Sequence, residues 1–314
     1  MTATAATRPE AASTGRDSTF TGTGTLVRFL LRRDRVKLPA WTLGIAVFVL
    51  YYAAALPTIF PTDEALQGAA TFAEGPVGAL LGGPGYGFDD LTIARFLVGQ
   101  YGLYFLLAAA VMSILLVSRH TRVEEQHGRA ELIRANVVGH HAPLTAALIV
   151  AVITNLTLAL LVFAAMAGSG FAASSSLLFG VGVGAGGLAF AGLTAMTVQV
   201  TEYPRAASGM AGAALGAAFV IRAAGDLIGE HGSWLSWLSP LAWPQQTRVF
   251  VDDRWWPLTL SVLFAAAMAA IGYWLASRRD LGAGLVAARP GRAEAAPWLR
   301  SPFTFALRLQ RASL

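Results

Sequence analysis

Six stretches of this 314-residue chain are long and apolar enough to cross a membrane, and they limit its fold more than any other feature. A helix needs roughly 20 apolar residues to cross about 30 Å of hydrocarbon. The six stretches lie near residues 38–56, 93–117, 144–167, 176–200, 206–224 and 257–277. A mean hydropathy of +0.56 with 13% charged residues is also too apolar for a soluble domain of this length. The predicted fold class is therefore an all-α membrane protein with six transmembrane helices.

The distribution of arginine predicts the orientation of these helices. Nineteen of the 23 Lys and Arg residues lie before the first span, between the second and third, between the fourth and fifth, or after the last. The loops on the opposite side, 57–92, 168–175 and 225–256, contain only two. By the positive-inside rule, both termini and the connection 118–143 are cytoplasmic. The net charge of +5 is thus a signal of membrane topology, and no nucleic-acid partner is expected.

Composition also divides the chain into regions and indicates its source. The predicted regions are a disordered cytoplasmic tail (1–22), a six-span transmembrane domain (23–280) and a second cytoplasmic tail (281–314). Within 25–41, Leu26, Phe29 and Leu30 share one helical face and arginines populate another, which is typical of an interfacial amphipathic helix. One Lys against 22 Arg, with many Ala and Gly residues, is typical of a GC-rich bacterial genome. The expected location is therefore the bacterial plasma membrane.

The connection between the second and third spans, "TRVEEQHGRAELIRANVVGHHAP" (121–143), is densely charged although it lies between two apolar stretches. Thr121 followed by Glu124 matches a capping box, which predicts that a helix begins there. Glu125 and Arg129 are spaced to support that helix as an i, i+4 pair. We predict a short amphipathic cytoplasmic helix that lies against the membrane with its charges facing the cytosol. The alternative is a solvated loop that only anchors topology.

The same stretch raises an enzyme hypothesis. "EEQHGR" (124–129) fits the EExxxR signature of the CAAX-type membrane proteases, but no Phe is followed four residues later by His, as their second motif requires. A general base also needs burial to raise its pKa, and this stretch is expected in a cytosolic connection. A metal site made by the histidines of this region lacks the HExxH spacing and is flanked by arginines. A membrane-embedded enzyme such as a CAAX-type protease is kept as the alternative function.

ATP hydrolysis by this chain is not expected. A Walker A motif needs a Lys after Gly to reach the phosphates, and the one lysine, Lys37, follows Val36. If transport is driven by ATP, another subunit supplies the ATPase.

The loop between the fifth and sixth spans is rich in tryptophan. Arg222 and Asp226, four residues apart before this loop, either form a pair on one helix face or leave Arg222 to reach the membrane interface. The tryptophans form an interfacial belt or belong to short re-entrant helices that close the outer end of a pathway. The candidate residues for an outer gate or structural cluster are Arg222, Asp226, Trp237, Pro240 and Trp243.

The order of these features resembles a known family. A basic lead-in, a span, a long outer loop, a second span and the charged connection together resemble a type-2 ABC exporter permease. "TEYPRAASGMAGAALGAAFVIRAAGD" and "SWLSWLSPLAWPQQTRVF" are similar to actinobacterial polyketide-antibiotic exporter permeases of the tetronasin-resistance type. The resemblance covers about residues 25–314 and is to the N-terminal half of those permeases.

The resemblance implies a function and partners. It implies a permease that moves a hydrophobic small molecule (antibiotic, drug or lipid) out of the cell, with no cofactor of its own and with ATP and magnesium in a partner ABC ATPase. The charged connection would be the coupling helix that docks in that ATPase, and Glu124, Glu125, Arg129 and Glu131 would carry the contact. The full set of candidate coupling residues is Thr121, Glu124, Glu125, Gly128, Arg129, Glu131 and Arg134.

The family pattern also predicts a second transmembrane half. Members of that subfamily usually carry two six-span halves in one chain. Residues 302–314 match the basic lead-in 26–38 at five positions and are similar to the opening of a second repeat. The second half is expected to be another copy of this chain or a separate chain.

Overall fold

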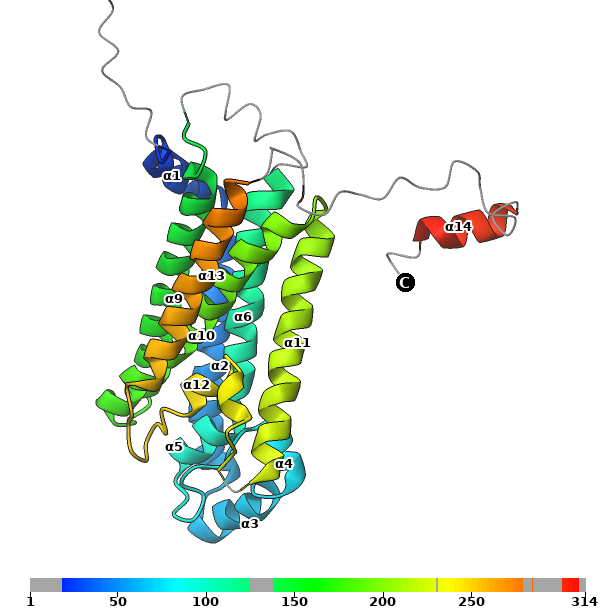
Figure 1. Ribbon diagram of the computed structural model, residues 1–314. Coiled ribbons are helices and arrows are strands. Elements are labelled where there is room, and N and C mark those ends of the chain that lie inside the picture. The colour runs from blue at the N-terminus through cyan, green and yellow to red at the C-terminus, as the bar shows by residue number, and fades with distance from the viewer. Residues whose placement is uncertain (1–18, 125–137, 230, 279–283, 285–300, 311–314) are drawn as a thin grey trace, which may run out of the picture.

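The computed structural model describes residues 19–124, 138–229, 231–278, 284 and 301–310, and these residues contain helices and no strand (Figure 1). Six helices are long and apolar enough to cross a membrane, as predicted. They are α2 (Lys37–Ile59), the continuous helix Ile93–Val123, α9 (Ala142–Gly168), α10 (Ala173–Val200), α11 (Pro204–Ile228) and α13 (Pro257–Ala276). Shorter helices are α1 (Thr23–Arg33), α3 (Asp63–Ala73), α4 (Pro76–Leu81), η3 (Ser236–Leu238), α12 (Ala242–Gln245) and α14 (Pro302–Gln310).

The second spanning helix is built from several segments. It comprises α5 (Ile93–Phe96), a π-helical turn (Leu97–Tyr101), α6 (Gly102–Ser118) and a second π-helical turn (Arg119–Val123). Single π-turns inside helices are frequent at functional sites. The second of them lies where the charged connection begins.

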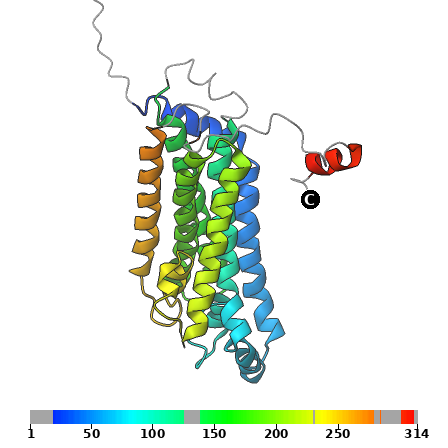
Figure 2. The same cartoon turned by 45° about the vertical axis from the view of Figure 1, so that its right-hand side comes forward.

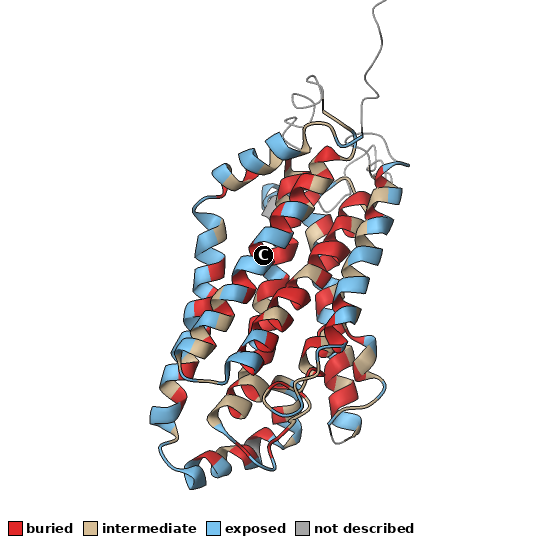
Figure 3. Cartoon of the chain, turned by 90° about the vertical axis from the view of Figure 1, so that its left-hand side faces the viewer, coloured by how far each residue is buried: buried red, intermediate tan, exposed pale blue. Residues whose placement is uncertain are grey.

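The long helices run side by side, and α10 lies at the centre of the bundle (Figures 1 and 2). In its most apolar window 83% of the residues of α10 are buried, against 17% for α13 at the edge. The burial colouring in Figure 3 shows the same division between a buried interior and exposed outer helix faces. We call the end of the bundle that carries α1 the basic end, and the opposite end, with α3, α4 and α5, the loop end (Figure 1).

Glycines let α10 approach its neighbours closely. A Cβ atom added at Gly180 or Gly184 would meet the backbone carbonyl oxygens of α9, and one at Gly192 would meet the backbone of Ala265 in α13. This is the packing that small residues at four-residue spacing favour in membrane helices. The same spacing in α11, at Gly212 and Gly216, lies on a face where an added Cβ meets nothing within 4 Å.

These two kinds of glycine should respond differently to alanine. Gly192→Ala is expected to destabilise the bundle by about 1–3 kcal/mol, because its new methyl group overlaps the backbone of α13. Gly212→Ala, the matched control, should leave stability unchanged or raise it slightly, since its site is open and alanine is the better helix former. Thermal unfolding of the two purified variants in detergent measures this, and equal midpoints would contradict the close contact between α10 and α13.

Candidate functional site

At the loop end, the two charged residues of α11 form a buried ion pair. Arg222 Nη1 lies 3.0 Å from Asp226 Oδ2, and their side chains are 0% and 1% exposed. Arg222 also donates hydrogen bonds to the carbonyl groups of Ala79 and Leu80 in α4, and the Ser236 hydroxyl donates to Asp226 Oδ1 over 2.6 Å. Of the two arrangements open from the sequence, pairing is confirmed. The pair joins α4, α11 and η3 at one point.

The loop after α11 folds back into the bundle. Leu241 and Thr247 are completely buried, and a Cβ added at Gly186 of α10 would lie 3.6 Å from the Pro244 ring. Trp243 Nε1 donates to the Trp237 carbonyl over 2.8 Å, with the partly buried Pro240 in the turn between them. We call this part of the loop the re-entrant segment, because it packs back into the helix bundle.

Other tryptophans of the same loop lie on the surface, unlike the buried residues of the re-entrant segment. Trp234, Trp255 and Trp256 are 75%, 48% and 54% exposed. Trp256 stacks on Trp237 with ring centroids 5.2 Å apart. The loop therefore has two parts: one is packed inside the bundle, and the other carries exposed tryptophans of the kind that the predicted interfacial belt requires.

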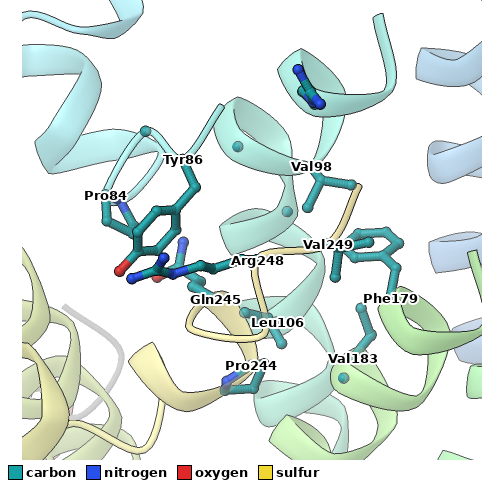
Figure 4. Close-up of a pocket in the computed structure, with 15 residues that line it drawn as sticks. Pro84, Tyr86, Val98, Leu106, Phe179, Val183, Pro244, Gln245, Arg248 and Val249 are labelled. Carbon is teal, nitrogen blue, oxygen red and sulfur yellow. The ribbon is translucent and has the colours of Figure 1, made fainter. Parts of the chain in front are cut away.

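A small cavity with a mainly apolar lining lies beneath the re-entrant segment (Figure 4). Its volume of about 40 Å³ has room for water molecules and is far below the roughly 300–1,000 Å³ of pockets for drug-sized ligands. The Arg248 guanidinium lies 4.3 Å from the centre of the Tyr86 ring, and the Tyr86 hydroxyl donates to Gln246 Oε1 over 2.5 Å. Burial raises the pKa of Tyr86, and the nearby Arg248 opposes part of that rise. This cavity is therefore too small for a drug-sized molecule.

Backbone strain is concentrated in the same loop. Among the described residues of the loop, four that are not glycine have left-handed φ angles: His231 (61°), Arg248 (50°), Phe250 (63°) and Asp253 (48°). A non-glycine residue in this conformation lowers the stability of the fold by about 1–3 kcal/mol, and it persists only where surrounding contacts hold it. For Phe250 and Asp253 the contacts come from the Asp253 carboxylate, which accepts from the Phe250 amide over 2.9 Å and from the Ser175 hydroxyl of α10 over 2.6 Å. The strained loop is thus locked to the central helix.

At the basic end, a cluster of charges joins α1 to the end of the second spanning helix. Asp34, 2% exposed, has one carboxylate oxygen 2.9 Å from Arg119 Nη2 and the other 3.0 Å from His120 Nε2. Next to it, Arg33 Nη1 lies 2.8 Å from Glu124 Oε1. The two ion pairs come from adjacent residues of the α1–α2 corner. Residues 119–124 are therefore tied to this corner by two ion pairs.

The predicted start of a helix at Thr121 is wrong. The spanning helix continues through Thr121, whose hydroxyl donates to the Val117 carbonyl over 2.7 Å. This is the usual alternative for a threonine inside a helix. Glu124 does not face the cytosol as expected, because its side chain is only 10% exposed and is paired with Arg33. The other candidate coupling residues lie outside the described residues: Glu125, Gly128, Arg129, Glu131 and Arg134.

The chain on the far side of 125–137 is attached to the same N-terminal region. The amides of Gly139 and His141 donate to the carbonyls of Thr21 and Thr19, each over 2.9 Å. Residues 19–22, which composition placed in the disordered tail, are thus bound to the bundle. Burial lowers the pKa of the His141 imidazole, and the neighbouring His140 lowers it further. Both flanks of 125–137 are held by α1 and the residues just before it.

An apolar groove lies between α2 and α6. Its volume is about 590 Å³, within the usual range for small-molecule sites, and much of its lining is aromatic. The lining residues are Ala40, Trp41, Gly44, Ile45, Phe48, Tyr52, Tyr104, Phe105 and Ala108. Trp41, Phe48 and Tyr104 are 38%, 61% and 44% exposed, so the groove opens sideways from the bundle. The sequence does not indicate this groove, because exposed aromatic residues in a span also fit ordinary contact with lipid.

Comparison with known proteins identifies related chains. The family model described as "Multidrug efflux system permease Rv1217c, C-terminal domain" matches residues 24–275. The multidrug efflux system permease protein Rv1217c of Mycobacterium tuberculosis (strain ATCC 25618 / H37Rv) is 40% identical over 301 residues, which cover 95% of this chain and 54% of that protein. The chain therefore spans about half the length of this relative. The matching model describes a C-terminal domain. The resemblance to the N-terminal half of polyketide-antibiotic exporter permeases therefore stays a prediction.

Proposed function

This chain belongs to the family whose model describes the C-terminal domain of the multidrug efflux system permease Rv1217c, and from that membership we propose that it is the transmembrane permease subunit of a type-2 ABC exporter. It moves a hydrophobic small molecule, such as a polyketide antibiotic, drug or lipid, out of the cell. The observation that carries the proposal is the 40% identity over 95% of the chain. Energy comes from a separate ATPase subunit that binds ATP and magnesium, because the sequence has no Walker A motif.

The proposed contact with the ATPase is the segment 125–137. Its charged residues Glu125, Arg129, Glu131 and Arg134 dock on the ATPase, while Glu124 anchors the segment to α1. The support is the attachment of both flanks to one N-terminal element, through Arg33 on one side and through Thr19 and Thr21 on the other. A displacement of the docked segment would then be passed to α1, α2 and the second spanning helix together.

The proposed substrate path starts in the groove between α2 and α6. Its aromatic, apolar lining suits a hydrophobic molecule that enters from the membrane. A second transmembrane half, either another copy or a separate chain, completes the path. One observation supports this: Gly212 and Gly216 of α11 present an open face suited to close helix packing.

Filling the groove tests the proposed path. Gly44→Trp is expected to lower ATP-dependent export of ethidium at least fivefold, because a Cβ at Gly44 meets no other atom within 4 Å and the indole ring can occupy the groove. Gly168→Trp is the matched control, at an equally open glycine outside the groove lining. The measurement is dye efflux from proteoliposomes that contain the permease with co-purified candidate ATPase subunits. Export that needs no ATPase would refute the proposed function, whereas normal export by Gly44→Trp would refute only this path.

We also propose that the basic end faces the cytoplasm of a bacterial cell, as the positive-inside rule indicates. The chain has no cysteine, so single cysteines can be introduced without background. Gln67→Cys, exposed on α3 at the loop end, should react with an impermeant thiol reagent in intact cells, and Arg205→Cys, exposed at the basic end, should react only after lysis. Labelling of position 205 in intact cells would reverse the proposed orientation.

A further inference from the structure

A second groove, on the other side of α2, differs from the first in carrying a cationic group. It lies between the α1–α2 corner and α9, with a volume of about 430 Å³. Leu38 and Leu43 of α2 face Ile153 and Leu161 of α9 across it, and Arg35 is the charged residue of its lining. Because Arg35 precedes the first residue of α2, the charge stands at one end of the groove and the apolar walls extend from it along the two helices.

The hydroxyl donors in the walls of this groove are all used within their own helices. The three threonines that line it are Thr42, Thr154 and Thr157. Their hydroxyls donate to the carbonyls one helical turn earlier in their own helices, over 3.1, 2.7 and 2.9 Å. The groove therefore presents a hydrocarbon-like surface in spite of its threonines. Such a surface suits an extended acyl chain better than a polar ligand.

At the head of the groove, no carboxylate of the described residues pairs with the positive charge. Arg35 is exposed and makes no ion pair with any described residue. The adjacent Asp34 does not neutralise it, because that carboxylate is buried and held by Arg119 and His120. Lys37, also exposed, begins α2 two residues later and adds to the positive potential. A ligand with an anionic group above an apolar chain would match both parts of this groove.

We propose that this groove binds an anionic phospholipid, with its phosphate at Arg35 and one acyl chain between α2 and α9. Charge complementarity and position favour this occupant: the groove opens on the outer face of a spanning helix, where lipid is the surrounding solvent, and basic pockets between such helices bind anionic head groups. The hydrophobic substrate proposed for the α2–α6 groove needs no such cation. The proposal of a lipid site is based on the shape and charge of this groove alone, and it does not depend on the proposed export function.

Native mass spectrometry of the detergent-purified full chain tests the site. With equal amounts of palmitoyl-oleoyl phosphatidylglycerol and palmitoyl-oleoyl phosphatidylcholine, the wild type should retain the anionic lipid at least about fivefold better, the effect of roughly one basic residue at an anionic membrane surface. Arg35→Gln should bring this ratio close to one. Arg205→Gln, which removes an exposed arginine at the same end but away from the groove, should leave it unchanged.

A second pair of variants tests the acyl-chain part. Thr157→Trp fills the groove and should reduce retention of both lipids, whereas Leu160→Trp, at a position 62% exposed on α9 outside the groove, should not. Glycerol 1-phosphate should not displace the bound lipid, since the head group alone lacks the apolar contacts. An unchanged preference in Arg35→Gln, equal retention by both tryptophan variants, or displacement by glycerol 1-phosphate would each overturn the proposal. A photo-crosslinker at position 157 that captures a polypeptide instead of lipid would do the same.

Discussion

Replacing Asp226 with Asn is expected to destabilise the protein by about 3–5 kcal/mol, the usual cost of removing one partner of a buried ion pair. The substitution keeps the size of the side chain but leaves the Arg222 guanidinium, 0% exposed, without a counter-charge. The Ser236 hydroxyl and the α4 carbonyls that meet at this pair would lose their fixed geometry as well. The measurement is the midpoint of thermal unfolding of the purified protein in detergent.

The chain provides a matched control for this experiment. Arg248 and Asp252 are also four residues apart and lie 3.1 Å from one another, but their side chains are 29% and 39% exposed. Asp252→Asn should leave the unfolding midpoint unchanged within error, because exposed pairs contribute little to stability. Equal effects of Asp226→Asn and Asp252→Asn would show that the α11 pair is not buried in the working protein.

Reversing the charge of Glu124 is expected to reduce ATP-driven export at least tenfold, or about 1.4 kcal/mol in effective coupling. Glu124→Arg would place a third cation beside Arg33 and Arg119 and would repel the α1–α2 corner from the second spanning helix. The double variant Arg33→Glu/Glu124→Arg restores an ion pair of opposite polarity and should recover much of the export. The measurement is ethidium efflux from proteoliposomes that also contain the ATPase subunit.

A comparison with Glu125 separates anchoring from docking. Glu125→Arg should weaken binding of the ATPase subunit, because this residue belongs to the proposed contact surface. Glu124→Arg should reduce export while leaving that binding closer to normal, because its side chain faces α1. If Arg33→Glu/Glu124→Arg exports no better than Glu124→Arg, the ion pair is not what connects the two elements.

The sequence alone determined the number and type of the spanning helices and the asymmetry of charge between the two ends. Both properties are local: a helix satisfies its own backbone hydrogen bonds, so a run of about 20 apolar residues is enough to specify a span. The sequence could also predict the pairing of Arg222 with Asp226, because it too is local: two residues four positions apart lie about one turn apart on the same helix face. The glycine spacing of α10 predicted close packing but not which helix would fill it.

Only the tertiary structure decided which distant groups meet. Thr121 and Glu124 fit a local capping box, but the helix of the second span continues through both residues. Glu124 instead forms an ion pair with Arg33, which is 91 positions away in the sequence. The re-entrant segment and both grooves beside α2 depend on how separate helices cross. The pattern of apolar and polar residues along one helix does not predict that crossing. In a chain where nearly every outward face is apolar, hydrophobicity no longer distinguishes core from surface, so packing partners are set by shape and by the few buried charges.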